Sequence, residues 1–362
     1  MKTILHIGSP KTGTTALQHG LHNARERLLE KGALYPFLST AEVSKNHGTL
    51  SIMLLRPERL PRIFRFKTDK DRQSAIETAL QEISYQIAKN EPDCLILSSE
   101  YFFRVVPLGL WPELLNKIPG CDPANLQICC YIRKPSAHYL SMLQQKLKAS
   151  HEIAPPAPHN FRRVLESYQE QFPDAEMSVR PFERGALKDG DILADFCTMQ
   201  MAELEEDTSA FTASEETNIS LSTPSMIALR DFRLKFFPDD NDKFMKASKL
   251  LIRNLVALDQ SMEIARPRLR AEIVDQIDYC DIDPVWLKDT HSVVFQGFDY
   301  DRAGTVKPDE RILPISSLRE VLELDIKVFG KLLARLRKRA FIQREESYVN
   351  WVDDLISRKD HV

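Results

Sequence analysis

Short apolar runs alternate with helical periodicity through the first half of the chain. The runs predict strands at residues 3–8, 94–97, 126–132 and 177–182. Between them, apolar positions spaced three and four apart predict amphipathic helices, among them 17–28, 76–87 and 136–149. The run 94–97 is apolar on both faces, which is typical of a central parallel strand. The pattern therefore predicts an α/β fold in which helices cover both faces of a parallel sheet, a three-layer α/β/α arrangement.

The pattern changes near the middle of the chain. An acidic stretch of low hydrophobicity at 203–216 predicts a surface loop or linker. Beyond it the pattern is mostly helical. Ser222–Pro224 has the composition of a helix start, and apolar positions over 318–332 predict a helix that leads towards a basic cluster. We expect an α/β domain at 1–230 and a helical C-terminal region at 231–362, packed on or beside it.

Composition and charge narrow the class of protein. The 362 residues are 43% hydrophobic and 28% charged, which is typical of a folded chain rather than a disordered or collagenous one. The net charge of −3 gives no general attraction for nucleic acid. No apolar run approaches the ~18 residues that span a bilayer, and the N-terminus lacks a signal-peptide pattern. We expect a cytoplasmic protein without a metal site, since the six cysteines show no CxxC spacing.

The strongest chemical feature is the segment Gly8–Thr15, with the sequence GSPKTGTT, between the first predicted strand and its helix. Glycines in that setting let a phosphate approach the backbone, and N–H groups at a helix start point at its charge. Lys11 adds a cation, and three threonines add hydroxyl donors. Thr14 stands where the nucleotide-triphosphate loop GxxxxGK[ST] needs lysine, which disfavours a kinase or an ATPase.

The segment His6–Leu17 resembles the 5′-phosphosulfate-binding loop of sulfotransferases that use 3′-phosphoadenylyl sulfate (PAPS), especially the bacterial and carbohydrate-modifying branch. In that family a later strand ends in an arginine, followed eight residues on by a serine, and the two bind the 3′-phosphate. Arg133 and Ser141 have this spacing. The resemblance covers roughly residues 1–230 and implies a P-loop-like fold. It implies donor contacts from Ser9, Lys11, Thr12, Gly13, Thr14, Thr15, Arg133 and Ser141. The chain lacks the RKG-containing segment of the small-molecule sulfotransferases, which favours the carbohydrate branch.

Sulfuryl transfer needs a cation at the bridging oxygen and a general base for the acceptor. Lys11 is the candidate cation. Glu100, at the carboxyl end of the second predicted strand, is one candidate base, because ligands of open parallel sheets bind at that edge. His47, in a polar connection between helices, is the other, because imidazole titrates near neutral pH.

Other polar residues are assigned with less support. The resemblance places a Ser/Glu/Tyr cluster after the strand that precedes Glu100, which adds Ser99 and Tyr101. His138 and His151 lie near the second motif and are weaker candidates for the base. His6 lies in the first predicted strand and is expected to be structural.

The resulting hypothesis is a metal-independent sulfotransferase that moves a sulfuryl group from PAPS to a hydroxyl or amine of a carbohydrate or other hydroxylated acceptor, releasing adenosine 3′,5′-bisphosphate (PAP). Two alternatives stay open: a P-loop nucleotide kinase or phosphotransferase, and a non-catalytic nucleotide-binding scaffold. A basic run near the C-terminus is expected to be a solvated helix face, with contact to an acidic acceptor or a membrane surface as the alternative. It comprises Lys331, Arg335, Arg337, Lys338, Arg339 and Arg344.

Overall fold

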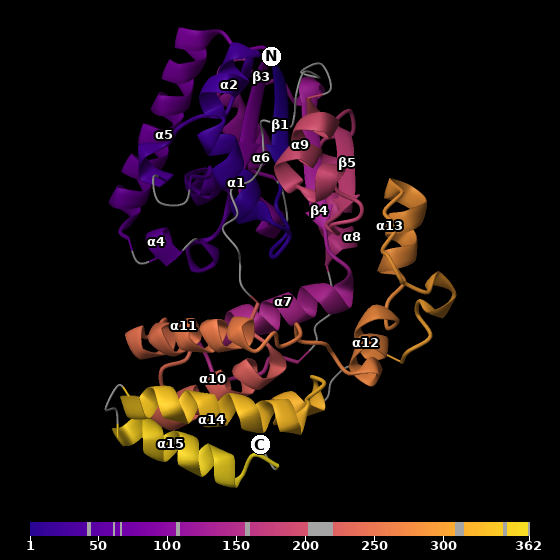
Figure 1. Cartoon of the computed structure of the whole chain (residues 1–362). Helices are drawn as coiled ribbons and strands as arrows, with labels where there is room; N and C mark the ends of the chain where they lie inside the picture. Colours follow the sequence, from indigo (N-terminus) through magenta and orange to yellow (C-terminus); the bar gives the residue numbers. More distant parts are fainter. Residues whose placement is uncertain are drawn as a thin grey trace. The chain divides into compact units, whose positions relative to one another are not determined.

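The computed structural model of the chain (Figure 1) describes most of its residues. The described ranges are 1–41, 45–60, 62–65, 67–105, 109–155, 160–201, 220–307, 315–342 and 346–360. The predicted acidic loop at 203–216 and Arg344 lie outside them.

The chain divides into two compact units, each assembled from separate stretches of sequence. The first unit comprises Met1–Lys134, His159–Glu216 and Asp283–Tyr300, and the second comprises Pro135–Pro158, Thr217–Ile282 and Asp301–Val362. The division expected from the sequence, at residue 230, falls inside a helix of the second unit. That two-domain division stays a prediction, and the units are described separately below.

A five-stranded parallel sheet forms the centre of the first unit. The strands are β1 (Lys2–His6), β2 (Ala33–Leu34), β3 (Cys94–Ser98), β4 (Leu126–Ile132) and β5 (Glu176–Pro181), in the order β2-β3-β1-β4-β5. The predicted α/β class with a parallel sheet is confirmed, and the arrangement is consistent with three layers. Four of the strands match predicted runs. Strand β2 was not predicted, because its two residues are too few to give a periodic signal.

The register brings the carboxyl ends of β1 and β3 level, and β4 extends three residues further in the same direction, to Ile132. His6, the last residue of β1, pairs with Ser98 on β3 and with Cys129 on β4. The segments that follow β1, β3 and β4 therefore leave the sheet at one edge, where open parallel sheets bind their ligands. We call this the carboxyl edge.

The helices of the first unit lie between its strands or follow the last of them, β5. They are α1 (Thr14–Asn23), α2 (Arg25–Glu30), α3 (Ser51–Leu54), α4 (Arg62–Arg65), α5 (Asp69–Asn90), α6 (Trp111–Asn116), α8 (Phe161–Gln171), α9 (Ile192–Gln200) and α13 (Asp283–His291). The single helix predicted over 17–28 is wrong, because the chain breaks at Ala24 into α1 and α2. The apolar spacing continues across the break, so Leu17, Leu21 and Leu28 are all buried in one cluster with β1 and β4.

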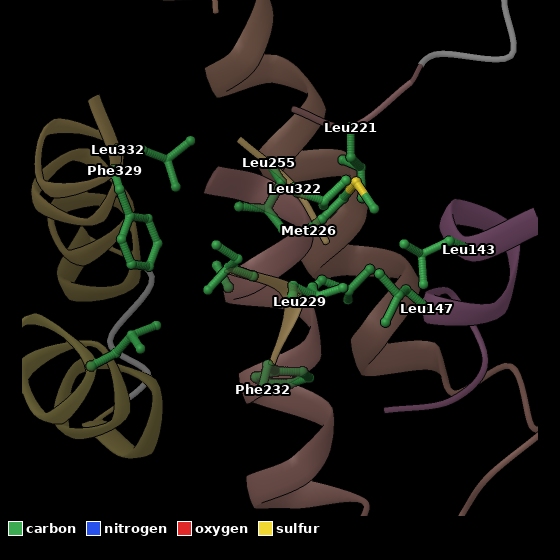
Figure 2. Close-up of a cluster of buried hydrophobic side chains, with 14 of the residues drawn as sticks. Leu143, Leu147, Leu221, Met226, Leu229, Phe232, Leu255, Leu322, Phe329 and Leu332 are labelled. Atoms are coloured by element: carbon green, nitrogen blue, oxygen red, sulfur yellow. The ribbon is translucent and has the colours of Figure 1, made fainter. Parts of the chain in front are cut away.

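The second unit is helical. Its helices are α7 (Pro135–Leu147), α10 (Thr223–Phe236), α11 (Lys246–Ser261), α12 (Ala271–Asp278), α14 (Ile326–Ile342) and α15 (Glu346–Ser357). Figure 2 shows its core, in which Leu143, Met226, Phe232, Leu255 and Leu332 meet from α7, α10, α11 and α14.

Buried carboxylates fix the starts of helices in the second unit. Ser222 is the N-cap of α10 and its side chain accepts a hydrogen bond from Ser225 N, which confirms the predicted helix start. Asp259 in turn accepts hydrogen bonds from Ser222 N, Ser222 Oγ and Ser225 Oγ at 2.6 to 2.8 Å. Asp278 likewise accepts from both Ser136 N and Ser136 Oγ at 2.8 Å. Each cap satisfies backbone donors that a helix start leaves open.

The helix predicted over 318–332 is also corrected. Leu318–Glu320 forms a single 3₁₀ turn, and Leu322 makes an antiparallel bridge with Leu269. Asp325 then starts α14 by accepting hydrogen bonds from the backbone N–H groups of Lys327 and Val328. The apolar spacing persisted because Leu318 and Leu332 are buried in the same core from different elements. None of the helices in the described ranges is long and apolar enough to cross a membrane.

Candidate functional site

The loop between β1 and α1 has backbone conformations and close contacts that require glycine at two positions. Gly13 is the N-cap of α1 with φ 75° and ψ 9°, in the left-handed region that favours glycine. A Cβ at Gly13 would lie 2.5 Å from the Phe182 ring, and a Cβ at Gly8 would lie 2.6 Å from Thr14 Oγ1. Lys11 also has a positive φ, at 64°. Both glycines are therefore required by close approach, and the loop holds one lysine in a strained conformation.

The side chains of the loop leave one buried donor open. Thr12 Oγ1 donates to Ser9 O at 2.6 Å, and Thr14 Oγ1 donates to the same carbonyl at 3.4 Å. These bonds fold the loop over Ser9, which is fully buried. The Ser9 hydroxyl itself has no hydrogen-bond partner among the described residues. No side chain caps the first turn of α1, whose Thr15 is exposed. Open donors at a helix start form a site for an anion.

Arg133 connects the end of β4 to this loop. Its Nη1 donates to Lys11 O at 3.2 Å, and its Cζ lies 5.8 Å from the centroid of the Phe182 ring. Burial lowers the pKa of Arg133 from its usual value, but an arginine in this range stays charged. One guanidinium N–H is used by the loop, so the fork keeps further donors. Ser141 lies on α7, in the second unit, and its predicted role stays a prediction.

A serine, a glutamate and a tyrosine follow β3 at the same edge. Ser99 is fully buried; its backbone N–H donates to His6 O at 3.2 Å and its Oγ accepts from Tyr101 N at 3.1 Å. Glu100, half-buried between them, forms no hydrogen bond or ion pair with the described residues. Burial and then the Glu100 charge raise the pKa of Tyr101, while Arg104 lies over the Tyr101 ring at 5.1 Å. Ser99 therefore fixes the turn that presents Glu100.

His47 has a different environment from the one expected. It is 1% exposed, not in an open polar connection. Its Nδ1 accepts from Ser98 N at 2.9 Å, and its Nε2 lies 3.0 Å from Pro36 O. Burial lowers its pKa to about 4. Because both ring nitrogens bond to backbone groups, His47 is a neutral link between β3 and the segment before it. This geometry does not favour His47 as a general base.

The other histidines also divide by environment. His6 Nδ1 lies 2.8 Å from Ser98 Oγ, which also accepts from Gln18 Nε2 at 3.1 Å. Burial lowers the pKa of His6 to about 3, and its Nε2 has no partner among the described residues. His138 and His151 lie in the second unit, where His151 Nε2 is 3.0 Å from Pro238 O. His6 is thus a buried, neutral residue at the carboxyl end of β1.

Phe182 was not identified from the sequence. It directly follows β5, at the same edge as the loop, and contacts both Gly13 and the Arg133 guanidinium. Its signal was present, because the predicted run 177–182 ended on this residue at a strand terminus. An apolar side chain there looked like the last core position of a strand.

Comparison of the chain with family models, with curated proteins and with solved structures finds no match. The chemistry of the site therefore rests on its own residues. Within the first unit, the carboxyl edge brings together a glycine-bearing loop with open donors, the Arg133 guanidinium and the Glu100 carboxylate. Such a set can bind an anion and accept a proton beside it.

Proposed function

We propose that the chain is a PAPS-dependent sulfotransferase whose first unit is a P-loop-like nucleotide-binding fold. In this proposal it transfers a sulfuryl group to a hydroxyl or amine of an acceptor, with a carbohydrate or glycoconjugate as the favoured class. The observation that carries the proposal is the loop Gly8–Thr15 at the carboxyl edge, tied by its Lys11 carbonyl to Arg133. It is the same loop whose sequence resembles the phosphosulfate-binding segment of that family.

The residues present fit a phosphosulfate. The buried Ser9 hydroxyl has no partner among the described residues, and the absence of a Cβ at Gly8 keeps the backbone close to Thr14. The Thr12 and Thr14 hydroxyls donate to Ser9 O, so we assign anion binding first to the backbone N–H groups from Lys11 to Thr15. Arg133 would hold the 3′-phosphate of the donor with the N–H groups that the loop does not use.

The proposed reaction needs few groups. An acceptor oxygen attacks the sulfur, the bond between sulfur and the bridging oxygen breaks, and the bridging oxygen leaves with PAP. Lys11 stabilises the negative charge that grows on that oxygen. Glu100 accepts the proton that the acceptor hydroxyl loses. We prefer Glu100 to His47 because the Glu100 carboxylate has no partner among the described residues, whereas both nitrogens of His47 are bonded.

The decisive experiment is calorimetric titration of the full chain with PAP in the presence of EDTA. We expect binding without a divalent cation. Arg133→Ala should weaken it at least ~30-fold, since a charge-assisted contact is lost, and Arg133→Lys should weaken it less. Arg184→Ala is the matched control, because Arg184 is exposed in the segment after the next strand.

Three outcomes would count against the proposal. Unchanged binding by Arg133→Ala would show that the second motif is misassigned. Tighter binding of ATP with Mg²⁺ than of PAP would favour the kinase class. Binding of PAP without sulfuryl transfer to any of a panel of oligosaccharide acceptors would favour a nucleotide-binding scaffold.

A further inference from the structure

Helix α14 of the second unit carries a concentrated positive charge. Its 17 residues, IKVFGKLLARLRKRAFI, include six Lys or Arg and no Asp or Glu. The whole chain has a net charge of −3. Because α14 carries +6, the rest of the chain carries a net charge of −9. Positive charge is thus gathered on one helix of an otherwise acidic protein, which makes α14 the place to look for an anionic partner.

Two of the six cations are used inside the fold. Arg337 forms an ion pair with Asp353 of α15, and Arg339 Nη1 donates to Asn254 O of α11 at 3.3 Å. The other four are Lys327, Lys331, Arg335 and Lys338. Their spacings of four, four and three residues place them on one face of the helix. We call this set the basic stripe.

The basic stripe faces away from the core. All four side chains are exposed, and none forms an ion pair with the described residues. The opposite face of α14 carries Phe329, Leu332, Leu333 and Leu336, all buried in the core of the second unit. From Lys327 to Lys338 the stripe extends for ~16 Å along the helix axis.

The surroundings of the stripe limit the shape of its partner. The neighbouring helix α15 has no Lys or Arg, and two of its three acidic residues are ion-paired, Asp353 with Arg337 and Asp354 with Lys235 and Arg358, so α15 adds no positive charge beside the stripe. A flat anionic surface would meet both helices, whereas a linear chain can follow the stripe alone. The apolar face of α14 is already buried, and so it is not available for insertion into a bilayer.

The chemistry of the exposed face narrows the partner further. The described exposed positions of α14 hold no aromatic side chain, so the stripe has no platform for stacking bases as in single-stranded nucleic acid binding. Repeated point charges without stacking suit a polymer of carboxylate or sulfate groups. We propose that the basic stripe binds a linear acidic polysaccharide. This inference stands on the second unit alone and does not depend on the proposed sulfuryl transfer.

The test uses the full chain and a fluorescent heparin dodecasaccharide as probe, followed by anisotropy at several salt concentrations. The variant K327Q/K331Q/R335Q removes two lysines and one arginine from the stripe. The matched control, K246Q/K249Q/R253Q, removes two lysines and one arginine from exposed positions of α11. Three nearby aspartates at 239, 240 and 242 precede α11 and weaken its field. We expect the stripe variant to lose at least ~10-fold in affinity with a shallower salt dependence, and the control to lose less than ~3-fold.

Other outcomes would overturn the inference. Equal losses in the two variants would mean that the probe responds only to net charge. Tighter binding of a 24-nucleotide oligothymidylate than of heparin at equal salt would assign the stripe to nucleic acid. The wild-type chain could also fail to bind heparin but sediment with vesicles of phosphatidylcholine and phosphatidylserine. If the stripe variant then lost the vesicle binding, the stripe would be assigned to a membrane surface. Circular dichroism and thermal unfolding of both variants confirm that each is folded.

Discussion

Two buried carboxylates in the second unit and two buried polar groups at the carboxyl edge of the sheet differ in their hydrogen bonding. In the second unit, the Asp259 carboxylate accepts three hydrogen bonds and Asp278 accepts two. At the carboxyl edge, the Ser9 hydroxyl and His6 Nε2 are buried with no partner among the described residues. Burying a polar group without a partner costs about 1–3 kcal/mol. The second unit is not free of such groups, since Arg233 Nε and Gln276 Oε1 are also buried without a partner among the described residues. The contrast therefore lies in these particular groups: the two carboxylates stabilise helix starts, whereas the Ser9 hydroxyl is open at the loop for which we propose an anion.

The largest expected effect comes from Glu100→Gln at the carboxyl edge. Turnover should fall by ~10²- to 10⁴-fold, because the acceptor proton loses its base. Affinity for PAP and the free energy of unfolding should stay unchanged, since Glu100 bonds to none of the described residues. Steady-state kinetics, calorimetry and urea unfolding measure the three quantities. Glu113→Gln, on α6, is the control.

Two results would contradict this view of Glu100. Turnover that survives Glu100→Gln would remove its assignment as base. Sulfuryl transfer that also survives the double variant with His47→Ala would remove both candidates named from the sequence.

A smaller effect is expected from Asp259→Ala in the second unit, which should lower stability and leave nucleotide binding unchanged. Removing the carboxylate leaves Ser222 N, Ser222 Oγ and Ser225 Oγ without their acceptor. The free energy of unfolding should fall by about 3 kcal/mol, while the affinity for PAP stays the same. The control is Asp239→Ala, at an exposed residue in the loop between α10 and α11, which should change neither the free energy of unfolding nor the affinity for PAP. If Asp259→Ala weakened PAP binding without lowering stability, the contrast between the two regions would be wrong.

The third effect is a dependence of stability on pH that comes from the buried histidines of the first unit. Burial lowers the pKa of His47 to about 4 and that of His6 to about 3, from 6.5. Between these values and 6.5 the unfolded chain binds protons that the folded chain does not. Stability is therefore complete above pH 6.5 and falls as the pH drops towards 4. Each histidine should lower the free energy of unfolding by about 2 kcal/mol at pH 5 relative to pH 8.

Urea unfolding at both pH values measures this loss. Replacing His47 by Asn should reduce the difference between pH 8 and pH 5, even though the variant is less stable at both. A difference that stays as large in His6→Asn and in His47→Asn would show that neither ring is buried neutral.

Most of the first unit's fold could be predicted because its three central strands, β1, β3 and β4, are buried on both faces. All seven residues of β4 are buried, and a run that is apolar except for Gln127 predicted the strand with its correct bounds. The breaks within helical patterns could not be predicted. Periodicity reports which residues reach a common core, and Leu318 and Leu332 reach one from different elements. Ala24 interrupts a helix in the same way without disturbing the apolar face.

The backbone positions of the candidate site could be predicted where local geometry demands particular residues, whereas the roles of those residues stay predictions. Gly13 needs its positive φ, and the position of Glu100 follows from a strand that ends at Ser98. His47 was misjudged because polar neighbours in sequence suggested solvent, whereas its ring packs 4.7 Å from Tyr35 and bonds to β3. The role of Phe182 depends on contacts between segments that are far apart in sequence, which local patterns do not report.

The bond from Arg133 to the Lys11 carbonyl has a consequence for selectivity. A hydrogen bond from the Arg133 guanidinium to the Lys11 carbonyl links the two groups that we propose as anion binders. In this proposal the loop and the Arg133 guanidinium stay at a set distance from each other. Ligands would be sorted by the separation between their two anionic ends rather than by total charge, and a molecule with the right charge but the wrong length would be rejected.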